Sequence, residues 1–295
     1  MQIDIASALL ATLSAVFFAV EISLIRKSTV KGEPIDAAMI TMWINLLIFA
    51  PLTLFYYPDF GLKIKTILAF TAAGIFGSFL ARICLYEGTK RVGASKSSPI
   101  LKGDLLIASL VGLIILEEPI TSGHISGILV LLAGVILVSY EMEKEKTGSN
   151  WKPKIGLLYP FGAMIFSGLS RPFAKVGLSA GTPVIAGLTV KFFVATAILS
   201  TYYIKKGNSP LAPFKARGRN YFIGAGIATS IGMWLIYSAL RSSRVVVVMP
   251  FWSLSPLFVL VISYFFLKRL ESISGKLILG TILVIIGTTL TGIFM

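Results

Sequence analysis

Ten apolar segments follow one another along the chain, and each is long enough to cross a lipid bilayer as a helix. Such a helix needs about 20 mostly apolar residues at a rise of about 1.5 Å per residue. Glycine, proline and charged residues fill the short connections, so no separate soluble domain is expected. The predicted spans are 5–25, 36–56, 66–88, 97–116, 122–141, 154–174, 184–204, 219–240, 246–267 and 273–294.

The composition indicates the same class of protein. Hydrophobic residues make up 56% of the 295 positions, charged residues only 14%, and the mean hydropathy is +0.86. Soluble domains carry about 25% charged residues, and the alternation typical of membrane β-strands is absent. We therefore predict an all-α integral membrane protein with ten transmembrane helices. The single cysteine, Cys84, excludes a disulfide within the chain, and no metal-ligand spacing is present.

Basic residues divide unevenly between the connections. The odd-numbered loops hold fifteen Lys and Arg residues, whereas the even-numbered loops hold five, namely Lys63, Lys65, Lys175, Arg241 and Arg244. Because positively charged loops stay in the cytoplasm, we expect the odd-numbered loops inside a plasma (cell) membrane and both termini outside. The net charge of +14 then reflects topology, and no nucleic-acid partner is expected.

The chain repeats itself at an offset of about 150 residues. We interpret residues 1–147 and 148–295 as two five-helix repeats of one monomer or homodimer subunit. Because five is an odd number, the second repeat enters the membrane in the opposite sense. Inverted repeats are a transporter architecture whose substrate site lies between the halves. The matched pairs are Tyr86 and Tyr237, Lys90 and Arg241, Pro99 and Pro250, Leu116 and Leu267, and Lys27 and Lys175.

Three stretches of the first half resemble the EamA-type module of the drug/metabolite transporter superfamily. They are Leu-Tyr-Glu-Gly at 85–88, Lys-Ser-Ser-Pro-Ile at 96–100 and Leu-Glu-Glu-Pro-Ile-Thr at 116–121, followed by Gly127 and Gly134. The second half repeats them more loosely, at 237–240, Pro250 and 280–287. The resemblance covers nearly the whole chain as two tandem modules. It implies secondary transport of small organic metabolites through a central cavity between the halves.

Ionisable residues inside membrane spans are costly, so they usually face a partner or a water-filled cavity. Counted from the predicted span ends, Glu21, Arg82, Lys102 and Asp104 share a level towards the odd-numbered loops. The same count places Arg171 and Lys191 towards the even-numbered loops. Structural ion pairs or snorkelling side chains are the alternative interpretation. The seven residues of this kind are Glu21, Arg82, Glu87, Lys102, Asp104, Arg171 and Lys191.

Proline and glycine interrupt two corresponding spans. Pro99 and Gly103 fall in the fourth span, and Pro250 and Pro256 fall in its repeat mate, the ninth. Paired breaks of this kind indicate a transporter site, because freed carbonyls and helix ends can bind a ligand. Aromatic side chains close to these positions are candidate cavity walls. The predicted substrate-binding residues are Glu21, Arg82, Tyr86, Lys102, Asp104, Arg171, Lys191, Trp234, Tyr237 and Trp252.

These features predict a secondary transporter, an exporter or exchanger that works by alternating access around a central cavity. The slightly positive set of buried charges favours a small polar organic metabolite, either amino-acid-like or a carboxylate. A proton or a counter-substrate is the candidate coupling partner. The alternatives are a passive channel or facilitator and a small-multidrug-like cation/proton antiporter that uses Glu21. No phosphate-binding loop or protease motif occurs, so we expect neither an enzyme nor a cofactor.

Overall fold

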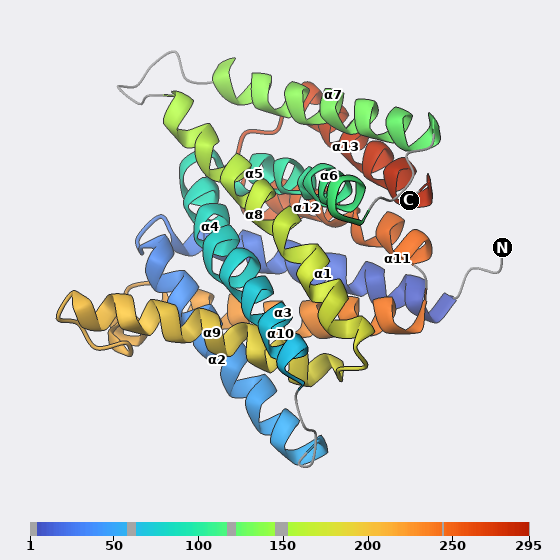
Figure 1. The fold of residues 1–295 in the computed structure, drawn as a ribbon. Coiled ribbons are helices and arrows are strands. Elements are labelled where there is room, and N and C mark those ends of the chain that lie inside the picture. The colour runs from blue at the N-terminus through green and yellow to red at the C-terminus, as the bar shows by residue number, and fades with distance from the viewer. Residues whose placement is uncertain (1–4, 58–62, 117–121, 145–152, 244, 295) are drawn as a thin grey trace.

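The computed structural model describes residues 5–57, 63–116, 122–144, 153–243 and 245–294. Within these ranges every regular element is a helix (Figure 1). Each predicted span corresponds to one helix or to a run of consecutive helices, which confirms the all-α prediction. Five of these stretches are long and apolar enough to cross a membrane by themselves: Ile5–Ser28, Pro34–Tyr56, Ile64–Val92, Val184–Lys205 and Arg219–Ser242.

The first half contains α1 (Ile5–Ser28), α2 (Pro34–Tyr56), a third span built from α3 (Ile64–Ala73), η1 (Gly74–Leu80) and α4 (Ala81–Val92), a fourth built from α5 (Ala94–Leu101) and α6 (Asp104–Leu116), and α7 (Ser122–Lys144). The second half contains α8 (Pro153–Ser179), α9 (Val184–Lys205), the short η2 (Ala212–Lys215), α10 (Arg219–Ser242), a ninth span built from α11 (Val245–Trp252) and α12 (Ser255–Phe266), and α13 (Gly275–Phe294).

The fourth and ninth spans are interrupted at corresponding residues. The break between α5 and α6 falls at Lys102 and Gly103, and the break between α11 and α12 falls at Ser253 and Leu254, 151 residues further on. At the first break the chain tightens to shorter-range hydrogen bonds, from Lys102 N to the Pro99 carbonyl at 3.1 Å and from Gly103 N to the Ile100 carbonyl at 3.0 Å. The prediction of paired breaks is therefore confirmed.

The third span holds a π-helical stretch that its pattern of residues does not predict. This stretch, η1, runs across Gly74 and Gly77. A Cβ at Gly74 would lie 2.6 Å from the Lys191 carbonyl oxygen, and one at Gly77 would lie 2.3 Å from Ser170 Oγ. The two glycines therefore let the third span approach α9 and α8 closely. Short π-helical stretches inside α-helices often lie at functional sites.

The first helix of each half packs mainly against helices of the other half. Helix α1 packs on α10 and on the broken span α11–α12, whereas its mate α8 packs on α3–η1–α4 and on the broken span α5–α6. Helix α2 packs against α9, and α7 packs against α13. The start of α1 and the end of α13 lie at one end of the bundle (Figure 1). We call this the even-loop end and the opposite one the odd-loop end.

Candidate functional site

A cavity of about 750 Å³ lies between the two repeats. Its lining comes from α1, η1, α4, α5 and α6 of the first half and from α8, α9, α10, α11 and α12 of the second. At one end the lining includes Gly181, Thr182 and Arg241, which lie at the even-loop end. Of the residues that the structure describes, none from an odd-numbered connection lines it. The cavity therefore extends from the middle of the bundle towards the even-loop end.

The deepest charges of the cavity form a compact ion pair. Arg82 of α4 donates to Glu21 Oε1 of α1 at 2.5 Å and to Thr229 Oγ1 of α10 at 3.2 Å. The Tyr86 hydroxyl donates to the same Glu21 oxygen at 2.7 Å. Tyr86 is fully buried and does not line the cavity, so the prediction that it forms an aromatic wall is wrong. Its hydroxyl group instead holds the Glu21 carboxylate in place through this hydrogen bond.

A second cluster surrounds the break in the fourth span. Asp104, the first residue of α6, accepts hydrogen bonds at Oδ2 from Ser167 Oγ at 2.8 Å and from Arg171 at 2.6 Å and 3.0 Å. Its carboxylate also stands at a helix N-terminus, where the peptide dipoles favour negative charge. The predicted separation of Asp104 and Arg171 onto two membrane levels is wrong. Helix α8 continues to Ser179, beyond the predicted end at 174, so Arg171 lies two turns before the end of the helix.

Trp252 joins this cluster to the broken ninth span. It is the last residue of α11, and its indole ring lies 3.5 Å from Lys102 Nζ and 4.4 Å from the Arg171 guanidinium carbon, measured to the ring centroid. Lys102 also donates to the Trp252 carbonyl oxygen at 3.2 Å. Cations over an indole face are attracted to its electron-rich surface. The two interrupted helices therefore meet at a tryptophan that holds two cationic side chains.

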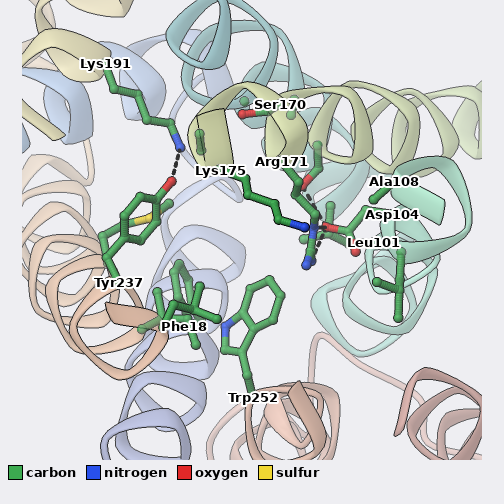
Figure 2. A pocket seen from close by; sticks show the side chains of 18 of the residues that line it. Phe18, Leu101, Asp104, Ala108, Ser170, Arg171, Lys175, Lys191, Tyr237 and Trp252 are labelled. Carbon is green, nitrogen blue, oxygen red and sulfur yellow. Dashed lines mark hydrogen bonds and ion pairs between the residues drawn. The ribbon is translucent and has the colours of Figure 1, made fainter. Parts of the chain in front are cut away.

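Lys191 occupies another side of the cavity, beside Tyr237 (Figure 2). It projects from the middle of α9, and its ammonium nitrogen lies 3.4 Å from the Tyr237 hydroxyl. A Cβ on Gly77 would lie 3.5 Å from this nitrogen, at ordinary contact distance, so the ammonium group lies beside the π-helical stretch. No carboxylate among the described residues forms an ion pair with Lys191.

Two basic residues of the cavity were assigned to even-numbered loops by the sequence, and the structure corrects this. Lys175 lies within α8, Arg241 lies in the last turn of α10, and both line the cavity. A helical signal was available, because Ser167, Arg171 and Lys175 are spaced four residues apart and share one face of α8. Trp234, by contrast, is 49% exposed and does not line the cavity, so its prediction as a wall residue is wrong.

The charge of the cavity is strongly positive. Of the described residues, its lining includes six basic side chains and two acidic ones. Both acidic residues, Glu21 and Asp104, are already bound to an arginine. The lining therefore carries a net charge of +4, which attracts anions and repels cations. Within the described residues, no group of three or more His, Cys, Asp or Glu side chains is placed to hold a metal ion.

The odd-loop end is closed by the Glu271 network, which comprises Arg26, Ala94, Ser95 and Glu271. The Glu271 carboxylate, whose side chain is 1% exposed, accepts from Arg26 Nε at 2.6 Å, from Ala94 N at 2.9 Å, and from the backbone N and hydroxyl of Ser95. It thereby caps the start of α5. Arg26 also donates to the carbonyls of Lys90 at 2.8 Å and Leu270 at 2.7 Å. Three odd-numbered connections are joined in this way.

Two inverted five-helix repeats around a polar cavity define a multi-pass membrane protein of the transporter class. The profile of the EamA-like transporter family matches residues 5–140 and 154–293, one match for each repeat, so the chain belongs to this family. Its members are transporters of the drug/metabolite superfamily. No curated protein gives a significant match.

The fold itself has a solved counterpart. One structure, described as "Crystal structure of protein", is similar to this chain with a TM-score of 0.66 and 13% sequence identity. The alignment covers 98% of this chain and 99% of the other chain. At this identity the likeness concerns the arrangement of helices alone.

Proposed function

We propose that the protein is a secondary transporter that exports or exchanges a small organic anion, with carboxylates as the main substrates. The observation that carries this proposal is the surplus of buried positive charge in the cavity between the repeats. Lys102 and Lys191 are each 4% exposed, and neither forms an ion pair among the described residues. Unpaired charges at membrane depth are costly and mark substrate pathways, so a bound anion would stabilise this cavity.

Alternating access is supported by the difference between the two ends of the molecule. The Glu271 network joins three connections at the odd-loop end, while the cavity reaches the even-loop end. A carrier must close one end while the other is accessible, and inverted repeats achieve this by rocking around the site. A passive channel has no need of a sealed end. Exchange of the two conformations would require the Glu271 network to separate.

The contacts of Glu21 disfavour a cation/proton antiporter. Its Oε1 accepts hydrogen bonds from Arg82 and Tyr86, so Arg82 already compensates its charge within the protein. A lipophilic cation would also have to enter a cavity whose lining carries a net charge of +4. Proton coupling through Glu21 or Asp104 remains part of the proposal for the anion transporter. Equal transport rates and pH profiles of Glu21→Gln, Asp104→Asn and the unmodified protein would exclude it.

The main test is transport into liposomes that contain the purified protein. We expect saturable uptake of labelled carboxylates and acceleration by unlabelled carboxylate trapped inside, because a carrier exchanges its substrate across the membrane. The variant Lys191→Gln should reduce uptake at least about tenfold, because the substrate loses one charge-assisted hydrogen bond. Lys206→Gln is the matched control, since Lys206 is exposed at the end of α9 and stacks on Tyr202. Flux that does not saturate would identify a channel instead.

The proposed location is the plasma membrane, with the odd-numbered loops in the cytoplasm. In that orientation the cavity of this structure opens outwards. The only cysteine is Cys84, so a Cys84→Ala background accepts single reporter cysteines without interference. A cysteine at Lys31 in the first loop should react only with permeant thiol reagents in intact cells. Reaction with an impermeant reagent would reverse the proposed orientation.

A further inference from the structure

We propose that the preferred substrate carries two anionic groups, one bound at Lys191 and Tyr237 and the other at Lys102 beside Trp252. This inference rests on the proposed function, because it refines the substrate of the same cavity. Dicarboxylates and phosphorylated carboxylates share the required chemistry, namely two negative groups at the ends of a short spacer. A monocarboxylate could satisfy only one of the two sites.

The first argument is charge balance in the deep part of the cavity. Its two acidic residues are committed, because Glu21 binds Arg82 and Asp104 binds Arg171. Lys102 and Lys191 are the cationic side chains left over at this depth, both 4% exposed and neither in an ion pair among the described residues. Each charge is only partly stabilised, one by an indole ring and the other by a phenol hydroxyl. Two negative charges on the substrate would neutralise both.

The second argument is the placement of the two cations. Lys191 and Tyr237 come from α9 and α10, whereas Lys102 lies at the break between α5 and α6 and contacts the end of α11. Figure 2 shows the Lys191–Tyr237 pair on one side of the cavity and the Arg171–Asp104 pair, which shares Trp252 with Lys102, on the other. The two lysines therefore contact different partners, one beside Tyr237 and the other beside Trp252.

The third argument is the apolar part of the cavity lining. Phe18, Met233 and Ile236 line the cavity together with the cations. Phe18 also packs edge-to-face on Trp252, with the ring centroids 6.3 Å apart. Apolar walls with a few polar groups at defined points are typical of sites that fix the orientation of a small ligand. A spacer of several carbon atoms between two anionic groups suits this lining better than a single inorganic anion does.

A chain-length series tests the inference directly. The purified protein is titrated with α,ω-dicarboxylates of three to eight carbons, each beside the monocarboxylate of equal length, and binding is followed by thermal shift. We expect one optimal length, at which the diacid binds at least about tenfold more tightly than its monoacid, because two linked contacts reinforce each other. A parallel arm with phosphorylated carboxylates of the same length distinguishes the two substrate sources.

Variants connect the preference to the two lysines. Lys191→Gln and Lys102→Gln should each lower diacid affinity to that of the monoacid and abolish the length optimum. Lys191→Arg, which keeps the charge, should retain the preference, and Lys206→Gln should change nothing. Melting temperatures without ligand verify that each variant is folded. The length series uses the unmodified protein, and Lys191→Arg is a conservative change. The inference can therefore still be tested if one of the Lys→Gln variants does not fold.

Two negative outcomes have different meanings. If monoacids bind as tightly as diacids at every length, the two-site inference is overturned, while carboxylate transport stands. If no mono- or dianion binds or is transported, the proposed function fails as well. A preference for diacids that survives both Lys→Gln variants would also overturn the inference, since it would locate the second anion elsewhere.

Discussion

The two ends of the molecule contain repeat-related residues, yet the odd-loop end is closed and the even-loop end is open to the cavity. At the odd-loop end, the Lys90 side chain binds Glu33 at 2.8 Å and its carbonyl oxygen accepts from Arg26. Its repeat mate at the even-loop end, Arg241, is exposed and lines the cavity. Lys90 of the first half therefore takes part in the contacts that close the odd-loop end. Its equivalent in the second half, Arg241, faces the open cavity. In an inverted repeat, an exchange of these two conformations would convert one accessible end into the other.

The broken spans show a second difference between the halves. Lys102 and Ser253 occupy equivalent positions in the two breaks, but Ser253 donates to the Pro250 carbonyl of its own helix at 2.7 Å. Lys102 instead lines the cavity and contacts Trp252 across the interface. The repeat therefore reproduces the backbone interruption but not its chemistry. At this contact the Lys102 ammonium group comes from the first half, and the indole ring of Trp252 comes from the second.

We expect the largest effect from Glu271→Gln, which should destabilise the closed conformation of the odd-loop end. Glu271→Gln removes the charge that compensates Arg26, and breaking a buried ion pair costs about 3–5 kcal/mol. Because the Arg26 side chain is 17% exposed, we expect about 2–3 kcal/mol against the closed conformation. In a Cys84→Ala background, a cysteine at Ser98, which lines the cavity, should become reactive towards an impermeant thiol reagent applied only from the odd-loop side.

A matched acidic residue provides the control for this change. Glu33 also binds a lysine at the odd-loop end, but its side chain is 65% exposed. Surface ion pairs contribute about 0–1 kcal/mol, so Glu33→Gln should leave the labelling of Ser98→Cys unchanged. Equal labelling in the two variants would show that the Glu271 network does not hold this end closed.

A smaller change at the same end comes from Gly93→Ala. Gly93 has a φ of 103°, and a Cβ there would lie 2.5 Å from Glu271 Oε2. The backbone strain alone costs about 1–3 kcal/mol, and the contact displaces the carboxylate that caps α5. We expect the labelling seen with Glu271→Gln, at a lower level. Gly207→Ala isolates the strain, since Gly207 has a φ of 73° and no atoms within 4 Å of the added Cβ.

At the centre of the cavity, Trp252→Leu should weaken substrate binding about fivefold to thirtyfold. The change removes the ring that holds Lys102 and Arg171, and a buried cation–π contact contributes about 1–2 kcal/mol. Trp234→Leu is the matched control on the outside of the bundle, where 49% of Trp234 is exposed. The expected change there is less than about twofold, read from the substrate concentration at half-maximal uptake. Similar losses in both variants would contradict the assignment of Trp252 to the site.

The smallest expected effect lies at the open end. Arg241 is exposed, so it should attract anions from solution rather than hold them. Arg241→Gln should slow uptake about twofold at low ionic strength and have no effect at about 0.5 M salt, where charges are screened. Uptake rates at the two salt concentrations give the comparison. A loss that persists at high salt would place Arg241 in the binding site itself.

Local patterns were sufficient for much of the fold. The apolar segments, the odd number of spans in each repeat and the prolines near residues 99 and 250 predicted ten spans, their inversion and the two breaks. These properties depend on hydrophobicity and on backbone chemistry within one helix. The π-helical stretch was missed because it arises where Gly74 and Gly77 meet α9 and α8, which are distant in the sequence.

The site depended on the sequence for its residue types and on the tertiary structure for their partners. Buried Glu21, Asp104, Lys102 and Lys191 were recognisable, because charges are rare in membrane spans. Only the packing of the halves decided that Asp104 binds Arg171, that Trp234 faces outwards and that Lys175 and Arg241 reach the cavity. The physical reason is that a helix period defines which residues share a face, whereas the contact between two helices defines which face is buried.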